Sequence, residues 1–120
     1  MTVDNRIIQT LSPLAPVNRD EIADKTQPGY TFNYDTLPIA FSSNAPAHER
    51  YLIQVHLFCP EGCDSLQIRN ATKQVLFKAR FSWPAEVDAG LESESPGDAT
   101  LQHYVYECER TERVVIDGGF

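Results

Sequence analysis

The chain lacks the motifs that most readily identify an enzyme. None of its six glycines lies in a phosphate-binding loop, and no serine occupies a Gly-x-Ser-x-Gly turn. No apolar run approaches the ~20 residues of a membrane span. The N-terminus places Asp4 and Arg6 before a very short apolar run, which is not the pattern of a signal peptide. We therefore expect neither catalysis nor a membrane partner.

Basic residues are also scarce. The 120 residues include 10 Lys and Arg against 17 Asp and Glu, which gives a net charge of −7 with histidine neutral. The cations near the centre of the sequence form no stripe with interleaved aromatics: Arg50, Arg69, Lys73, Lys78 and Arg80. Nucleic acids and anionic membranes are bound by clustered Lys and Arg, so the composition argues against either as a tight partner.

Cysteine is rare as well. Of the three cysteines, Cys59 and Cys63 are close in sequence and Cys108 is distant. Their segment CPEGC does not have the two-residue spacing of redox and zinc motifs. Without an export signal we expect reduced thiols with a structural role. The sequence therefore predicts no metal and no cofactor.

What the chain does contain is one long strand-like run. Residues 51–59, YLIQVHLFC, are apolar except at two positions, and a Pro-Glu-Gly turn follows them. Alternate side chains of a strand point to opposite faces. One face would be apolar or aromatic: Tyr51, Ile53, Val55 and Leu57. The other would be mixed: Leu52, Gln54, His56 and Phe58. We predict a central strand over residues 49–59, with helices on the first face and solvent or another subunit on the second.

The other segments alternate between helical and strand-like patterns. Val3, Ile7 and Leu11 recur at helical spacing and predict a helix over residues 3–11. Strands are expected at residues 30–34, 49–59, 81–87 and 101–110, with an edge strand or turn at 37–41 and a loop at 42–47. A second helix is expected at residues 65–79.

These elements predict the fold class. In the order α-β-β-α-β-β they form an α+β two-layer sandwich, in which one mainly antiparallel four-stranded sheet has two helices packed on one face. The length fits a single domain over residues 1–120, with residues 116–120 as a flexible tail.

The second predicted helix has two contrasting faces. At about 100° per residue, one quadrant is apolar and should face the sheet: Ile68, Ala71, Val75 and Ala79. Leu66 and Phe77 lie nearly opposite to it. An exposed phenylalanine on a polar helix face indicates a second contact surface. The alternative is that Phe77 folds under the loop that follows the helix.

The mixed face of the sheet contains the one candidate chemical cluster. His56 and His103 each lie on the less apolar face of a strand, and Glu107 lies on the same face as His103. If the two strands are neighbours, these side chains could form a metal or acid–base site. We favour the alternative, in which they are ordinary polar residues of an exposed or interfacial sheet face.

Residues 88–99, DAGLESESPGDA, are acidic and contain glycine and proline. This composition is typical of a surface loop. Its four carboxylates lack the regular spacing of a calcium-binding loop: Asp88, Glu92, Glu94 and Asp98. We therefore expect no specific metal site there.

Several segments, taken in order, resemble one family. A short N-terminal helix leads into LSPLAPV, and then come GYTFNYD, ERYLIQVHLFCPEG, SLQIRNATKQVLFKARF, SWPAEV, an acidic turn and QHYVYECE. This ordered set resembles the small tail-terminator or tail-completion proteins of long-tailed phages and prophages, especially those of Gram-positive bacteria. The resemblance covers roughly residues 7–110. No single motif is diagnostic, and the resemblance lies in the order in which these segments occur.

The resemblance implies a structural protein of the virion tail, assembled in the cytoplasm of a bacterial host. Such proteins form a hexameric ring at the head-proximal end of the tail tube, which stops tube polymerisation and joins the tail to the capsid. The implied partners are further copies of the chain, the tail-tube protein and a head–tail connector or neck protein. Genome DNA would pass through the channel without specific binding, since an acidic lumen repels phosphates.

In such a ring we assign two sets of residues. The subunit or partner interface would use the mixed sheet face and the outer side of the helix: Gln54, His56, Phe58, Leu66, Phe77, His103 and Glu107. The channel- or tube-facing loop would carry the four acids Asp88, Glu92, Glu94 and Asp98. One departure is that the segment SSNAPA is short and lacks the long acidic insertion expected between the first two strands.

Three other functions remain open at the level of sequence. The first is a head-closure or adaptor ring protein of the phage neck. The second is a small monomeric protein-binding module. The third is a metal-dependent enzyme that uses His56, His103 and Glu107.

Overall fold

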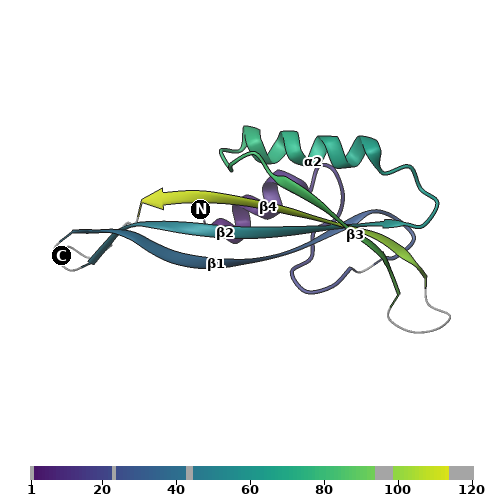
Figure 1. Cartoon of the computed structure of the whole chain (residues 1–120), viewed down its shortest axis with the longest axis horizontal. Coiled ribbons are helices and arrows are strands. Elements are labelled where there is room, and N and C mark those ends of the chain that lie inside the picture. The colour runs from purple at the N-terminus through teal and green to yellow at the C-terminus, as the bar shows by residue number, and fades with distance from the viewer. Residues whose placement is uncertain (1, 23, 43–44, 94–98, 114–120) are drawn as a thin grey trace.

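The fold is built on one antiparallel sheet. The computed structural model describes residues 2–22, 24–42, 45–93 and 99–113. Its elements are α1 (Val3–Leu11), β1 (Gly29–Ser42), β2 (Ala45–Pro60), α2 (Leu66–Lys78), β3 (Ala85–Glu92) and β4 (Leu101–Arg113) (Figure 1). The four strands lie in the order β1-β2-β4-β3. The α+β class and the element order expected from the sequence are therefore confirmed, and β2 is an interior strand.

Several strand boundaries differ from the expectation. β1 runs to Ser42 and β2 starts at Ala45, so the loop predicted at residues 42–47 is wrong apart from residues 43–44, which lie outside the described residues. β3 starts after Pro84, because proline cannot donate to a sheet ladder. It then continues to Glu92, through the first part of the predicted acidic loop. The predicted tail, residues 116–120, also lies outside the described residues.

The first helix has the predicted bounds. Val3, Ile7 and Leu11 are all buried. The side chain of Thr2 accepts a hydrogen bond from the backbone N–H of Asn5 at 3.2 Å, which satisfies one of the donors that a helix leaves free at its start. Neither helix of the described residues is long and apolar enough to cross a membrane.

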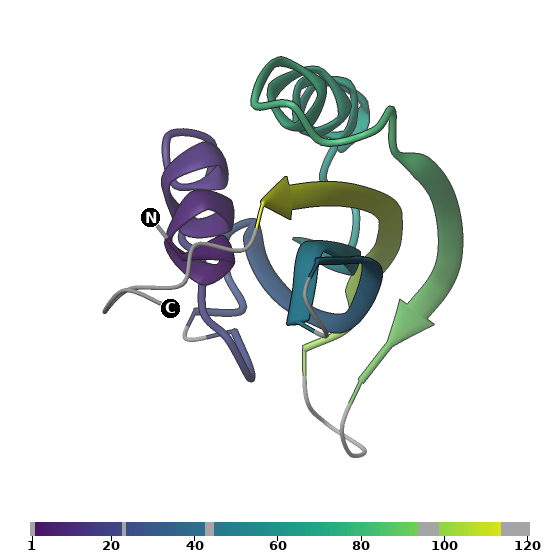
Figure 2. The same ribbon diagram turned by 90° about the vertical axis from the view of Figure 1, so that its left-hand side faces the viewer.

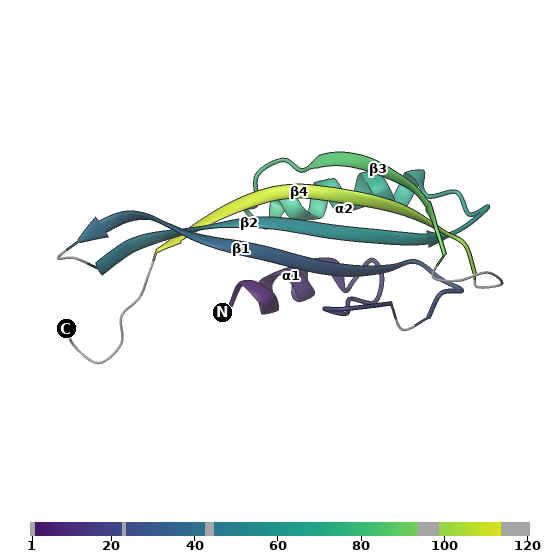
Figure 3. The same cartoon turned by 60° about the horizontal axis from the view of Figure 1, so that its bottom comes forward.

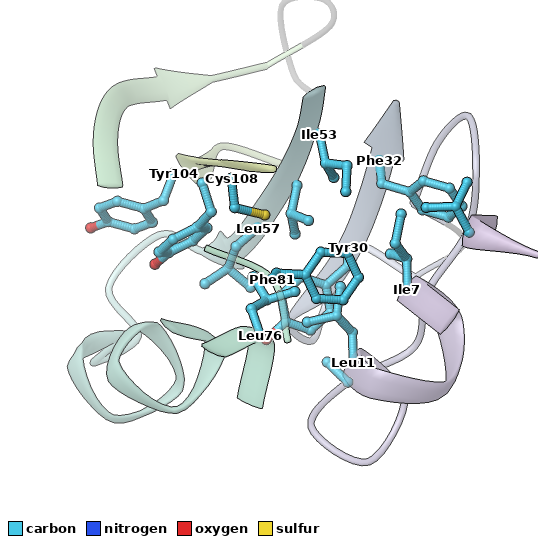
Figure 4. Close-up of a cluster of buried hydrophobic side chains, with 14 of the residues drawn as sticks. Ile7, Leu11, Tyr30, Phe32, Ile53, Leu57, Leu76, Phe81, Tyr104 and Cys108 are labelled. Atoms are coloured by element: carbon cyan, nitrogen blue, oxygen red, sulfur yellow. The ribbon is translucent and has the colours of Figure 1, made fainter. Parts of the chain in front are cut away.

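Both helices pack on one face of the sheet, which we call the inner face (Figure 2). Apolar side chains of β1, β2 and β4 converge there on α1 and α2 (Figure 4). Ile53 and Val55 pair in register with Cys108 and Tyr106. These four residues are therefore neighbours on one face of the sheet.

The buried stripe of α2 is rotated from its predicted position. Thr72 and Leu76 are its fully buried residues, whereas Ile68, Val75 and Ala79 of the predicted quadrant pack against the core while only partly buried. Thr72 can be buried because its hydroxyl is satisfied: it donates to the carbonyl of Ile68 at 2.7 Å and lies 2.6 Å from the hydroxyl of Tyr30. Burial also raises the pKa of Tyr30 to about 12.

A left-handed turn ends α2. The backbone N–H of Phe81 donates to the carbonyl of Leu76, and that of Arg80 donates to Phe77, each at 3.1 Å. This pair of bonds requires a left-handed residue between them, usually glycine, and here it is Arg80 with φ of 75°. Leu76 and Phe81 anchor the turn in the core, which leaves Phe77 at the surface.

Candidate functional site

A hydrogen-bonded network crosses all four strands on the outer face of the sheet. His56 on β2 lies 2.9 Å from His103 on β4, measured from Nδ1 to Nε2. The other nitrogen of His56 lies 3.0 Å from Oδ1 of Asn33 on β1. The other nitrogen of His103 lies 2.7 Å from a carboxylate oxygen of Glu92 on β3. We call these four residues the outer-face network.

The directions of these hydrogen bonds depend on which ring nitrogens carry protons. An ionised carboxylate only accepts, so His103 donates from Nδ1 to Glu92. With both rings neutral, His103 Nε2 then accepts from His56 Nδ1, which leaves His56 Nε2 facing the Oδ1 acceptor of Asn33. A hydrogen bond between neutral His56 and Asn33 therefore requires the Asn33 amide turned so that its Nδ2 donates.

Aromatic stacking covers His103, the one buried residue of the network. The ring of Phe58 lies nearly parallel to that of His103, at 10° and 4.4 Å between centroids. His103 is only 8% exposed. Burial and the neighbouring His103 lower the pKa of His56 below its ordinary value, while Glu92 opposes that shift.

The expected cluster of His56, His103 and Glu107 is half right. The structure brings the two histidines together, but their carboxylate partner is Glu92, from a segment predicted to be a loop. A β-bulge at Asp88–Gly90 shifts the register of β3 by one residue, which puts Glu92 on the outer face. Among the described residues, no three His, Cys, Asp or Glu side chains are grouped to hold a metal ion.

The remaining predicted residues of the sheet lie apart from the network. Gln54 and Glu107 are register partners and line a separate hollow of about 560 Å³. Asp88 belongs to β3, where its carboxylate accepts the backbone N–H of Gly90 at 2.8 Å, so its prediction as a loop residue is wrong. Glu94 and Asp98 lie outside the described residues.

An acidic pocket borders the network. It has a volume of about 530 Å³, and the segment before β1 forms one of its walls. Its apolar lining includes Ile22, Phe58, Leu91 and Leu101, and its charged lining consists of Asp20, Glu21, Glu92 and Lys25. We call this hollow the acidic pocket. The described lining therefore carries three carboxylates and one lysine next to apolar side chains, and one of these carboxylates, that of Glu92, already contacts His103.

A second surface feature lies at the end of α2. Phe77 and Trp83 meet edge to face with ring centroids 5.5 Å apart, and they are 55% and 56% exposed. Lys78 and Arg80 lie between them in sequence and are also exposed. We call these four residues the aromatic–basic patch. Phe77 thus does contact the following loop, yet it remains a surface residue. Leu66 is equally exposed at the opposite end of α2.

Several of these residues had no distinguishing signal in the sequence. Asp20 and Glu21 belong to the polar connection between α1 and β1. This connection reaches the pocket because backbone hydrogen bonds join Pro16 and Asn18 to Tyr30, which lies further along the chain. Trp83 stands out in the sequence as the only tryptophan, six residues after Phe77. The sequence contains no signal that its side chain is exposed.

The three cysteines are free thiols. Burial raises the pKa of Cys59 to about 11 and that of Cys108 to about 12. A thiol with so high a pKa is protonated near neutral pH and is a poor nucleophile. Cys63 is exposed at the turn after β2.

In comparisons with known proteins, no model of a protein family matches the chain, and no curated protein matches it.

Proposed function

We propose that this chain is a structural protein of a phage tail, which caps the head-proximal end of the tail tube as a ring of identical copies. In this role it ends tube polymerisation and joins the tail to the capsid through a neck protein.

The observation that carries this proposal is where the resembling segments fall. GYTFNYD lies on β1, ERYLIQVHLFCPEG on β2 and its turn, SLQIRNATKQVLFKARF on α2, and QHYVYECE on β4. The likeness therefore spans three strands and the main helix of one domain, rather than a local motif. The elongated shape, 56 × 27 × 22 Å, adds support because it offers long sides for contacts between copies. The β1–β2 hairpin reaches beyond both helices at one end (Figure 3).

The net charge of −7 also supports a channel through which DNA slides without sticking. The genome, further copies of the chain and the tail-tube protein are thus the proposed partners, and the assembled tail is the proposed location.

The test is reconstitution with the tail-tube protein. We expect native mass spectrometry to detect a closed oligomer, and negative-stain images to show rings on one end of tubes that are shorter than tubes grown without the chain. Monomers alone, even with tube protein present, would contradict the proposal. A ring that binds the connector but never a tube end would assign the chain to head closure instead.

A further inference from the structure

We propose that the aromatic–basic patch of one copy of this chain docks into the acidic pocket of a second copy. The inference rests on the proposed function, because it supplies the contact by which a ring would form. It commits to one occupant for the pocket, namely Phe77 and Trp83 with their flanking cations.

The patch has the composition of a binding anchor. Tryptophan and arginine are enriched among the residues that carry most of the binding energy in interfaces. The edge-to-face contact of Phe77 with Trp83 already fixes both rings, so little conformational freedom is lost when a partner covers them. More than half of each ring's residue surface is open to solvent, and docking would remove it from water.

The pocket has the complementary chemistry. Its apolar lining, which includes Phe58 and Leu101, suits aromatic rings, and its volume of about 530 Å³ is in the range that admits a large side chain. The rim carboxylates of Asp20 and Glu21 form no ion pair with the described residues, nor do Lys78 and Arg80. Opposite charges are thus left unpaired in two places, which a contact between copies would pair.

The backbone of Arg80 supports the same conclusion. Its left-handed conformation is strained for a non-glycine residue, and glycine would adopt it without that strain. The presence of arginine at this position therefore lowers the stability of the fold. Local backbone strain of this kind is concentrated at binding and other functional sites.

The positions of the two surfaces decide the kind of contact. The patch lies at the end of α2 and the start of the connection to β3, at the upper left in Figure 1. The pocket is lined by Leu91 and Glu92 at the end of β3, the strand end that lies at the lower right in Figure 1. The two surfaces lie at different ends of the fold, so a contact between the patch of one copy and the pocket of the next can repeat head-to-tail from copy to copy. Such contacts close into a ring when the rotation between copies permits.

The experiment uses Trp83 as its own reporter, because it is the only tryptophan. We expect its emission to move to shorter wavelength as protein concentration rises, in step with the mass measured by sedimentation. Two variants reverse charge on one side each: Lys78→Glu with Arg80→Glu, and Asp20→Lys with Glu21→Lys. Each should weaken association on the order of tenfold or more. All four changes in one chain should restore it, which misfolding could not do.

Gln67→Ala is the matched control, since Gln67 is exposed on the same helix but lies in its first turn, away from the patch. It should leave association and emission unchanged. The proposal is overturned if wild-type emission never shifts, if both reversals leave association intact, or if the shift requires added tail-tube protein. Rings that cap tubes despite both reversals would overturn this contact and leave the proposed function standing. If the variant with all four changes regains association but no ring caps a tube, the contact stands and the proposed function is contradicted.

Discussion

The inner and outer faces of the sheet exclude water by different means. On the inner face, Val55 and Leu57 have no exposed surface because helices cover them. On the outer face His103 is nearly as buried, but it is held by Phe58 and by hydrogen bonds to both ring nitrogens. Inner-face burial depends on apolar volume, whereas outer-face burial depends on particular partners. The inner face thus explains the fold, and the outer face borders the surface proposed for assembly.

The largest expected effect compares two leucines of β2. Leu57→Ala should lower the free energy of unfolding by about 2–5 kcal/mol, because it leaves a cavity among fully buried neighbours. Leu52→Ala, on the outer face at 37% exposed, should cost less than about 1 kcal/mol. Urea unfolding followed by circular dichroism measures both. Equal losses would show that the two faces are packed alike.

A smaller effect is expected from the outer-face network. His103→Leu keeps a side chain of similar bulk but removes both hydrogen bonds, and should cost about 1–2 kcal/mol. Glu107→Gln, at an exposed site on the same strand, is the control and should change stability by less than about 0.5 kcal/mol. If His103→Leu is neutral or stabilising, hydrogen bonding does not hold the outer face together.

The turn after α2 anchors Leu76 and Phe81 in the core of the inner face and presents Arg80 to solvent. Arg80→Gly should raise the free energy of unfolding by about 0.5–1 kcal/mol, since glycine adopts positive φ without strain. Arg80→Ala keeps the strained backbone and should gain nothing. A stabilised Arg80→Gly monomer with weaker association would separate the needs of folding from those of assembly. An unchanged or lowered stability would contradict the strain at this turn.

The smallest expected effect is a dependence on pH. Burial lowers the pKa of His56 below its ordinary 6.5, so the unfolded chain binds this proton more readily than the folded chain does. The stability that neutral His56 contributes is present above about pH 6.5 and is lost as the pH falls through the lower folded-state pKa. His103 and Glu92 are the titratable groups that act on it.

His56→Gln should therefore flatten the decline of Tm between about pH 7 and about pH 5, measured by calorimetry. The same slope in variant and wild type would mean that His56 gains its proton as easily in the folded chain as in the unfolded one.

Local patterns were sufficient where one physical cause acts along the chain. The helical spacing of Val3, Ile7 and Leu11 predicted α1, and the alternation in β2 predicted which side chains face the core. They were insufficient for α2, where the polar Thr72 is buried through its bond with Tyr30, 42 residues away in sequence. Hydrophobic periodicity cannot register a polar residue that is buried because a distant partner satisfies it.

The candidate site shows the same division. Residue type and face placed His56 and His103 together once their strands paired. The acid that joins them is Glu92 rather than Glu107, because the bulge at Gly90 puts Glu92 on the outer face. A one-residue shift exchanges the faces of a strand, and the sequence contains no unambiguous signal for it.

By itself the sequence determined the fold class, the order of the elements and the apolar face of the central strand, because short-range periodicity and solvent exclusion act on every segment alike. Only the tertiary structure decided which polar groups meet. It joined Asp20 and Glu21 to the far end of the sheet, and it exposed Phe77 and Trp83 around a strained turn. Those placements depend on contacts between segments distant in the chain, and such contacts exist only after the chain has folded.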